Sequence, residues 1–397
     1  MAMTRVRDAR AALRGEAAVA ITFVVNGVVF ASLLPRLPQI KAQLGLGNAA
    51  FGLALLGAGI GGLVGSALAP HALERAPRAR TVVVAGVLLA AAGLGPPVVA
   101  AAPGSAVAPG LLLGIALFVV GMIDAVHDVT MNVVALGLQR ARGASIMGRL
   151  HATWSAGAVA GGVVGAAAAA WGVPVVAHMA AAVLLAVALQ VFAARALPDP
   201  TRAPPAAPAS RRRLVGIWVA MGAVAIAAGL SEGPPLDWSA IYLREGLGTG
   251  PGLAGAAPVC FTAAMLASRL LVDRAIDRWG AAAVATAAGL LVAVSMVAGL
   301  WISSATGSPV AALIGFALAG AGSAPVFPLM FVAGERLPAA RNGAGAGAVS
   351  AMARIGFLIA SPVIGVTSEA VGLAWALMIV VATGGVIIAL SLPPRLR

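Results

Sequence analysis

Long apolar runs dominate the chain, and short polar segments separate them. A helix needs about 20 apolar residues to cross a hydrocarbon core about 30 Å thick. Twelve runs approach or exceed that length, with charges, Pro and Gly between them, so the pattern predicts an all-α membrane protein with twelve transmembrane helices. The expected spans are Ala17–Leu34, Ala49–Leu68, Thr81–Ala101, Pro109–Leu136, Leu150–Trp171, Val173–Ala194, Leu214–Pro234, Leu253–Val272, Ala281–Ser303, Pro309–Ala333, Gly343–Val366 and Leu373–Ser391.

The composition supports the same fold class. Of the 397 residues, 61% are hydrophobic and only 10% are charged, whereas soluble domains carry about one quarter charged residues. Disorder needs low hydrophobicity and collagen needs glycine at every third position, and the chain has neither property. These numbers exclude a soluble globular protein and leave a polytopic helical membrane protein.

The positions of the charges predict the orientation in the membrane. The chain has 26 Lys and Arg against 13 Asp and Glu, a net charge of +13. Of these basic residues, 21 lie before the first span, after the last, or in every second loop between spans. Cytoplasmic loops are rich in Lys and Arg, so we expect a multi-pass protein of the inner (cytoplasmic) membrane with both termini in the cytoplasm. The net positive charge is then explained by the orientation of the protein in the membrane, and we expect no nucleic-acid partner.

A proline-rich segment divides the spans into two sets of six. Residues 197–213 contain five prolines and end in three consecutive arginines, a composition typical of an extended linker. We expect an N-terminal six-helix bundle over residues 1–196, this segment as a cytoplasmic linker, and a C-terminal six-helix bundle over residues 214–397. A parallel repeat of two six-helix units is the simplest account of this division.

The fourth span carries three ionisable residues, which need a partner, a water-filled cavity or a neutral state at bilayer depth. Asp124, His127 and Asp128 stand at i, i+3 and i+4, and Asn132 continues the row, so all four are expected on one helical stripe. Two carboxylates one turn apart disfavour each other's charged form, which makes both candidates for reversible protonation. His127 is a third candidate. The alternative is structural: the acids pair with arginines, and the imidazole donates to a backbone carbonyl.

Arg354 is expected near the middle of the eleventh span, about 20 Å along the helix from Arg341. A guanidinium stays protonated there, so it must face an acid, a group of carbonyls or an anionic substrate. An ion pair with Asp124, Asp128 or Glu232 is the structural alternative to substrate binding.

Glu232 is expected near the outer end of the seventh span, directly before Gly233-Pro234-Pro235. Prolines break helices and free carbonyl groups, which a membrane tolerates only beside protein or water. Glu232 is therefore a candidate outer gate or proton entry, and capping of the broken helix or an ion pair with Arg244 is the alternative.

Other polar residues in the spans allow two interpretations each. Asn26, in the middle of the first span, is a candidate substrate ligand, although bridging between helices is the commoner role. Trp154 is a candidate for stacking on a substrate, and an anchor at the membrane interface competes with this. For Asp237 and Trp238 we expect interfacial anchoring.

The loops after the second and eighth spans carry a repeated pattern. The second copy reads Arg269-Leu-Leu-Val-Asp273-Arg274-Ala-Ile-Asp277-Arg278-Trp279-Gly280, and the first keeps Gly65 and Arg78 but has no Asp. This pattern resembles the signature loop of the major facilitator superfamily (MFS), and the resemblance extends over essentially the whole chain. It implies that Asp273, Arg274, Asp277, Arg278 and Gly280 latch a cytoplasmic gate, and that the latch is incomplete in the first half.

Four further segments resemble a poorly characterised bacterial branch of inner-membrane transporters in that superfamily. They are Asp128-Val-Thr-Met131-Asn132, His151-Ala-Thr-Trp154-Ser155, Asp237-Trp238-Ser-Ala-Ile-Tyr242-Leu-Arg244-Glu245 and Gly356-Phe-Leu-Ile-Ala-Ser-Pro362-Val-Ile-Gly365. Because Asp128 lies in the branch pattern, the resemblance favours it as the coupling acid, whereas position along the span favours Asp124. The branch tends to place an aromatic residue at the position of Arg354.

From these observations we expect a secondary transporter that moves a small organic molecule by alternating access, coupled to protons, with efflux favoured. Proton-coupled uptake of a sugar or organic acid, and a non-transporting membrane receptor with the same fold, are the alternatives. There is no phosphate-binding loop and no Cys/His metal pattern, so we expect no enzyme, no cofactor and no metal. The expected partners are the substrate, protons and the lipid bilayer, and the expected state is a monomer.

Overall fold

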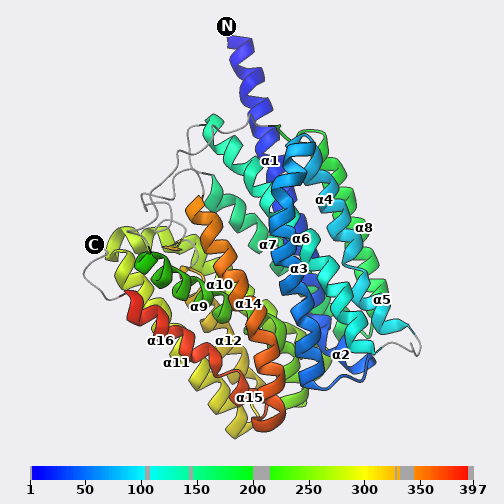
Figure 1. The fold of residues 1–397 in the computed structure, drawn as a ribbon, viewed down its shortest axis with the longest axis vertical. Coiled ribbons are helices and arrows are strands. Elements are labelled where there is room, and N and C mark those ends of the chain that lie inside the picture. The colour runs from blue at the N-terminus through cyan, green and yellow to red at the C-terminus, as the bar shows by residue number, and fades with distance from the viewer. Residues whose placement is uncertain are drawn as a thin grey trace.

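The computed structural model of the protein describes residues 2–102, 108–142, 146–199, 215–326, 329–330 and 344–391. Its regular elements are helices, most of which run side by side along one direction (Figure 1). The residues before 200 form one group of packed helices, which we call the N-terminal bundle: α1 (Ala2–Leu33), η1 (Leu34–Arg36), α2 (Leu37–Gln43), α3 (Asn48–Arg75), α4 (Arg78–Ala92), α5 (Gly95–Ala101), α6 (Pro109–Arg142), α7 (Met147–Ala170) and α8 (Val175–Ala194).

The residues after 214 form a second group, which we call the C-terminal bundle. The linker expected over residues 197–213 lies almost entirely outside the described residues. The elements of the second group are α9 (Val215–Ile241), η2 (Tyr242–Gly246), α10 (Pro251–Trp279), α11 (Ala281–Thr306), α12 (Pro309–Ser323), α14 (Ala344–Val371), α15 (Leu373–Ala376) and α16 (Ile379–Ser391).

The helices coincide with the expected spans. Within the described residues, nine helical segments are long and apolar enough to cross a membrane. The three remaining spans correspond to α9, to α12, and to α15 with α16. The third span is divided at Gly95-Pro96-Pro97: α4 ends at Ala92 and α5 begins at Gly95, because prolines interrupt the hydrogen bonding of a helix.

Successive spans alternate in direction (Figure 1). We call the side at which α1 begins the N-side and the opposite side the far side. Helices α1, α4 with α5, α7, α9, α11 and α14 run from the N-side to the far side, and α3, α6, α8, α10, α12 and α16 return. The turn between α10 and α11 uses Gly280 with φ of +82°, a conformation that favours glycine.

Glycine rows set the closest helix contacts in the N-terminal bundle. Gly57, Gly61 and Gly65 follow one face of α3 and lie directly against the backbone of α6. A Cβ atom at any of the three would collide with a backbone carbonyl of α6. Small residues at this spacing let two helices approach closely, which gives extensive van der Waals contact where no hydrophobic force acts between helices.

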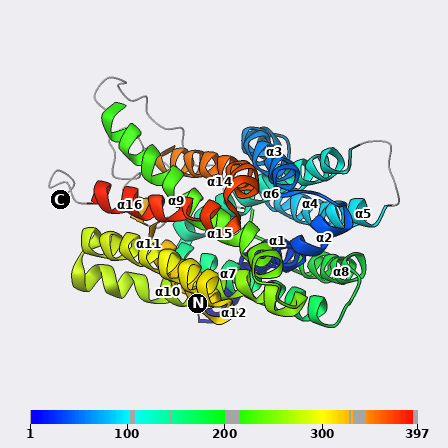
Figure 2. The same ribbon diagram turned by 90° about the horizontal axis from the view of Figure 1, so that it is seen from below.

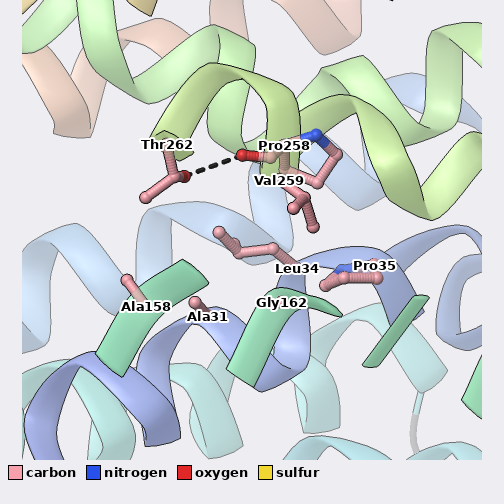
Figure 3. Close-up of a pocket in the computed structure, with 8 residues that line it drawn as sticks. All are labelled: Ala31, Leu34, Pro35, Ala158, Gly162, Pro258, Val259 and Thr262. Atoms are coloured by element: carbon pink, nitrogen blue, oxygen red, sulfur yellow. Dashed lines mark hydrogen bonds between the residues drawn. The ribbon is translucent and has the colours of Figure 1, made fainter. Parts of the chain in front are cut away.

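The two bundles meet along α3 with α14 and along α7 with α10. Figure 3 shows part of the second contact, where η1 and α7 pack on α10 with no room for a water molecule between them. Where α3 meets α14, Gly52 and Gly59 fit against the backbone of Ser361 and Leu358. The residues at the contact in Figure 3 are Ala31, Leu34, Pro35, Ala158, Gly162, Pro258, Val259 and Thr262.

Asp237 and Trp238 do not anchor the membrane interface as expected. Trp238 is fully buried, its ring lies edge-on to Phe51 of the other bundle at 5.7 Å between centroids, and its Nε1 donates to Ser361 Oγ at 3.3 Å. Asp237 Oδ2 accepts from the same hydroxyl at 2.7 Å. The expectation was wrong because η2 continues the chain beyond α9 and closes over these residues, so they lie inside the far-side contact between bundles.

Two ionic contacts join the bundles at the far side. Lys41 Nζ contacts Glu245, at 2.7 Å from each carboxylate oxygen. Glu369 Oε1 accepts from the backbone N–H of Ala49 at 2.9 Å. Because α3 begins at Asn48, the Glu369 carboxylate lies at the positive end of the α3 dipole. The first contact is thus an ion pair between the bundles, and the second links the start of a helix in one bundle to a charge on the other.

The glycine row predicts the effect of adding side-chain volume between α3 and α6. We expect Gly61→Val to destabilise the protein by about 1–3 kcal/mol, because overpacking forces the helix backbones apart. The thermal unfolding of detergent-purified protein measures this. Gly385→Val is the matched control, since a Cβ there meets nothing within 4 Å. Equal melting temperatures for the two variants would show that the close approach is not needed.

Candidate functional site

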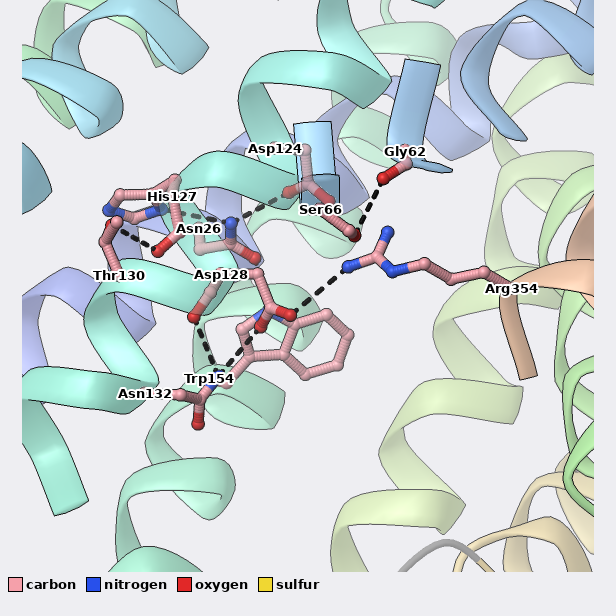
Figure 4. Close-up of polar contacts among 10 residues, drawn as sticks. All are labelled: Asn26, Gly62, Ser66, Asp124, His127, Asp128, Thr130, Asn132, Trp154 and Arg354. Atoms are coloured by element: carbon pink, nitrogen blue, oxygen red, sulfur yellow. Dashed lines mark hydrogen bonds and ion pairs between the residues drawn. The ribbon is translucent and has the colours of Figure 1, made fainter. Parts of the chain in front are cut away.

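Helix α6 carries the predicted acidic stripe into the interior of the protein, as Figure 4 shows. Asp124 and Asp128 are partly buried, one turn apart, while His127 between them is fully buried. Asn132 donates to Asp128 Oδ1 at 3.0 Å and to the Asp128 carbonyl at 2.9 Å. The four residues predicted for one stripe are therefore brought together by the structure, and the contacts of each differ.

Asn26 of α1 is the centre of a polar network that joins three helices (Figure 4). It is buried, and its Nδ2 donates to Asp124 Oδ1 at 2.8 Å and lies 3.2 Å from His127 Nδ1. Its Oδ1 accepts from Trp154 Nε1 of α7 at 2.7 Å. One amide thus bonds to α6 and α7 at once, which is the bridging role that intramembrane asparagines commonly take.

Trp154 is not an interfacial anchor, which was the competing interpretation from the sequence. Helix α7 begins at Met147, so Trp154 lies two turns inside the protein and directs its indole N–H at Asn26. The ring also contacts Phe30 of α1, at 6.1 Å between centroids. The indole is partly exposed beside the acids of α6, where a bound molecule can contact its face.

Arg354 of α14 makes an ion pair with Asp128 across the two bundles. Its Nη2 lies 3.3 Å from Asp128 Oδ2, and both side chains are largely shielded, with 20% and 33% of their surface exposed. A Cβ at Gly62 of α3 would lie 3.0 Å from the guanidinium, so the glycine leaves the space that the arginine occupies. Of the acids proposed as partners from the sequence, the structure selects Asp128.

Glu232 meets a different arginine from the one named as a possible partner. Its Oε1 lies 3.7 Å from Arg269 Nη2 of α10, and Arg269 Nη1 donates to Ser155 Oγ of α7 at 3.0 Å. Arg244, the alternative partner, instead donates to the Thr249 carbonyl at 2.6 Å. Arg269 is a second intramembrane arginine from the C-terminal bundle that reaches the N-terminal bundle, and sequence reasoning did not assign it a role. The signal was present: the depth argument applied to Arg354 applies equally to Arg269.

The helix does not break at the prolines after Glu232. Helix α9 continues through Pro234 and Pro235 to Ile241. Proline at position 235 leaves the carbonyl of Ser231 without its helical donor; Ser323 Oγ of α12 lies 3.5 Å from that oxygen, but its hydroxyl lies closer, at 2.9 Å, to the Ala319 carbonyl. The expectation of a broken helix was wrong, because α9 keeps its helical course through both prolines, as spanning helices can do when they pack against neighbouring helices.

The predicted gating segment is the N-side end of α10 and the turn into α11. Gly280 forms the turn, and the Arg278 guanidinium lies over the Trp279 ring, 5.7 Å from its centroid. Arg274 and Asp277 lie on the last two turns of α10, on which Asp273 also falls. Their role as a latch stays a prediction.

In the described part of the chain, the polar contacts between the bundles lie at the far side or near the middle of the spans. The far-side contacts are those of Lys41 and Glu369, and the contacts at mid-span are those of Arg354 and Arg269. The polar network of Asn26 lies beside Arg354, at the level of the mid-span contacts (Figure 4). Polar and ionisable groups at this depth between two packed bundles define a membrane transport protein.

Comparison with known proteins identifies the family. The chain is 32% identical over 323 residues to the uncharacterized transporter y4wD of Sinorhizobium fredii, covering 79% of this chain and 80% of that protein. It is 30% identical over 315 residues to the uncharacterized MFS-type transporter YPO1221/y2967 of Yersinia pestis, covering 79% and 78%. The family model of the Major Facilitator Superfamily matches residues 224–396. The protein belongs to the major facilitator superfamily of transporters, as the sequence resemblance predicted, and is not an enzyme.

The fold agrees with solved members of that structural class. The crystal structure of a D-xylose-proton symporter superposes with a TM-score of 0.71, covering 96% of this chain and 95% of the symporter, at 15% identity. At that identity the likeness concerns the fold alone. It confirms the prediction of an all-helical membrane protein with many apolar spans.

The ion pair across the bundles predicts a coupling between two residues that are 226 positions apart. We expect Asp128→Asn and Arg354→Gln each to lower the melting temperature, because each leaves a shielded charge without its partner. The double variant should lose less stability than the sum of the losses in the two single variants, and the difference, the interaction energy, should be about 0.5–3 kcal/mol.

A double-mutant cycle by thermal unfolding measures this interaction, and the control cycle combines Arg354→Gln with Glu369→Gln. The control residues share α14 but are separated by about 22 Å of helix, so their effects should add. Additivity in the Asp128 cycle as well would show that the pair does not hold the bundles together.

Proposed function

We propose that the protein exports a small organic molecule from the cytoplasm in exchange for protons, by alternating access between the two bundles. The N-side faces the cytoplasm in this proposal, with both termini on that side, because basic residues gather in its loops. Residues 1–196 and 214–397 act as the two units that rock against each other, and the segment 197–213 joins them.

One observation carries the proposal: the Asp128–Arg354 pair joins the two bundles near the middle of the spans, at the end of the region of contact that begins at the far side. In the described residues the far side is held by packed helices and two ionic contacts, which supports a conformation closed at that side. Protonation of Asp128 removes the charge that holds Arg354. The pair is then lost, and the equilibrium between conformations shifts by the difference in interaction energy.

The shared residues support exchange rather than joint movement of substrate and proton. Asp124 and Asp128 contact the same side chains that are the candidate substrate ligands, namely Asn26, Asn132 and Arg354. A substrate that takes these contacts competes with the ion pair, and a proton on either acid weakens substrate binding. By linkage the reverse holds equally, and mutual exclusion at one site produces antiport.

Glu232 and Arg269 form a second polar link near the same depth. Arg269 touches Glu232 within its own bundle and Ser155 in the other, so a proton on Glu232 frees Arg269 to change partner. This supports a part for Glu232 in proton coupling, separate from the Asp124 and Asp128 cluster. His127 lies behind Asn26 and is placed to orient that amide in the same network.

Substrate identification is the first step in the test of proton exchange. A thermal-shift screen of small organic molecules on purified protein supplies hits, and each hit is then offered to proteoliposomes with an internal pH dye. We expect substrate addition to move protons in the opposite direction to the substrate.

Variants of the acidic cluster then test the coupling. Asp124→Asn and Asp128→Asn together should abolish the proton signal, while Glu74→Gln, an exposed acid at the end of α3, should leave it unchanged. A double variant that still exchanges protons would overturn the coupling role of these acids. Ligand binding without any transport would favour a receptor.

The far-side contacts predict the accessibility of Lys41, the only lysine in the chain. It is 6% exposed and paired with Glu245, so we expect slow labelling of intact cells by a membrane-impermeant amine reagent. Glu369→Gln removes the negative charge from the second far-side contact and so weakens it, and it should increase the labelling rate severalfold, because it favours opening at that side.

Two features make the labelling experiment specific. The other reactive amine, the N-terminus, is on the N-side and is protected in intact cells if that side is cytoplasmic. Glu74→Gln, on the N-side, should not change the labelling rate. Rapid labelling of the unaltered protein would contradict a closed far side. Equal labelling rates for Glu369→Gln and Glu74→Gln would show that Glu369 does not help to close that side.

A further inference from the structure

A cavity of about 540 Å³ lies on the N-terminal bundle, away from the polar network. It is bordered by the N-side ends of α3 and α4, with α6 as its floor, and Figure 2 shows α6 between these two helices. Its lining consists of Leu68, Ala72, Arg75, Ala76, Arg80, Thr81, Val84, Ala85, Leu88, Met122, Ile123 and Val126.

The cavity is on the outside of the bundle. Met122 and Val126 continue the stripe of α6 that begins with Leu111, Ile115 and Val119, and these three apolar side chains are exposed. Asp124 and Asp128 project from the opposite face of the same helix. The cavity is therefore separated from the candidate transport site by the width of α6.

Its walls have the character of a surface that contacts hydrocarbon. Leu68 on α3 and Val84 and Leu88 on α4 are each about half exposed, at 47%, 48% and 50%. In a membrane-spanning region such large apolar side chains face lipid chains. A hollow with these walls, between two helices that both pack on α6, accommodates an acyl chain lying along the helices.

The mouth of the cavity at the N-side is basic. Arg75 ends α3 and Arg80 lies in the first turn of α4, and both side chains are exposed and line the cavity. Neither makes an ion pair with any residue that the structure describes. The other titratable groups at this mouth are His71, Glu74, Arg78 and Asp199, whose Oδ1 accepts from the backbone N–H of Arg78 at 2.9 Å. Two acids against three arginines leave an excess of positive charge at the level where phospholipid headgroups begin.

We propose that this cavity binds an anionic phospholipid of the bilayer, with an acyl chain against α6 and the headgroup phosphate between Arg75 and Arg80. Two guanidinium groups converge on one phosphate, for which their planar donors are well suited. Basic pockets between transmembrane helices on the cytoplasmic side recognise acidic headgroups in this way. The bound lipid ties the end of α3 to the start of α4, beside the turn that joins them.

Native mass spectrometry of the full-length protein tests the proposal, with phosphatidylglycerol and phosphatidylcholine of equal chain length as probes. We expect selective retention of one phosphatidylglycerol. Arg75→Gln with Arg80→Gln should weaken that binding by about fivefold for each arginine. Arg140→Gln is the matched control, an exposed arginine on the same side about 21 Å along α6 from Val126, and it should retain the lipid.

A second variant separates a shaped site from general surface charge. Ala72→Trp fills the cavity and keeps both arginines, and we expect it to lose the bound lipid while its melting temperature in lipid-free detergent stays close to that of the unaltered protein. If Ala72→Trp does not fold, Val84→Ala serves instead, and it should reduce retention by removing acyl contact.

Three outcomes would overturn the proposal. They are equal retention of both lipids, retention of phosphatidylglycerol by the Arg75 and Arg80 double variant, and displacement of the lipid by millimolar inorganic phosphate, which would show a phosphate site without an acyl component. Because none of these measurements uses transport, failure here leaves the proposed exchange mechanism untouched, and the reverse is equally true.

Discussion

A charge in the hydrocarbon core must have a partner, and in this protein that constraint is met across the boundary between two helix bundles. Arg354 has no acid on its own helix at that depth, so it takes Asp128 from α6. The consequence is structural as well as electrostatic. Gly62 must lack a side chain to admit the guanidinium, Asn132 orients the carboxylate, and α14 must lie against α3. One desolvated ion pair thus sets the relative position of three helices.

The polar network around Asn26 complements that pair in a different way. Its bonds stay within the N-terminal bundle, joining α1 to α6 and α7, so they hold one face of the site rigid while the Arg354 contact can be exchanged. A transport site needs both properties: a surface that keeps its geometry, and a link that reports occupancy to the rest of the protein. The two tasks differ in their chemistry: the bond from Trp154 to Asn26 joins two neutral groups, whereas the ion pair is lost when Asp128 takes up a proton.

Much of this architecture could be predicted from the sequence, for reasons that are local. Span positions follow from apolar length, and Asp124, Asp128, Glu232 and Arg354 stand out because ionisable residues are rare at that depth. Partner choice was not predictable, because it depends on which helix faces which. Sequence reasoning left three acids open for Arg354, named Arg244 as one possible partner of Glu232, and passed over Arg269. It also expected Pro234 and Pro235 to break a helix, because the packing of α9 against α14, α16 and α12 that surrounds these prolines cannot be read from the local sequence.

The glycines of α3 have a consequence that reaches beyond packing. This helix presents bare backbone to α6 on one face and, at Gly52 and Gly59, to α14 on another. The first contact lies within a bundle and the second between bundles, and in the second the side chains of Leu358 and Arg354 lie against Gly59 and Gly62. Separation of α3 from α14 therefore moves side chains of α14 away from glycines of α3, and no side chain of α3 at these positions has to change its rotamer. A helix that separates from α14 at one face and stays packed on α6 at the other can serve as a hinge element. A side chain added to the face that meets α14 would push the two bundles apart.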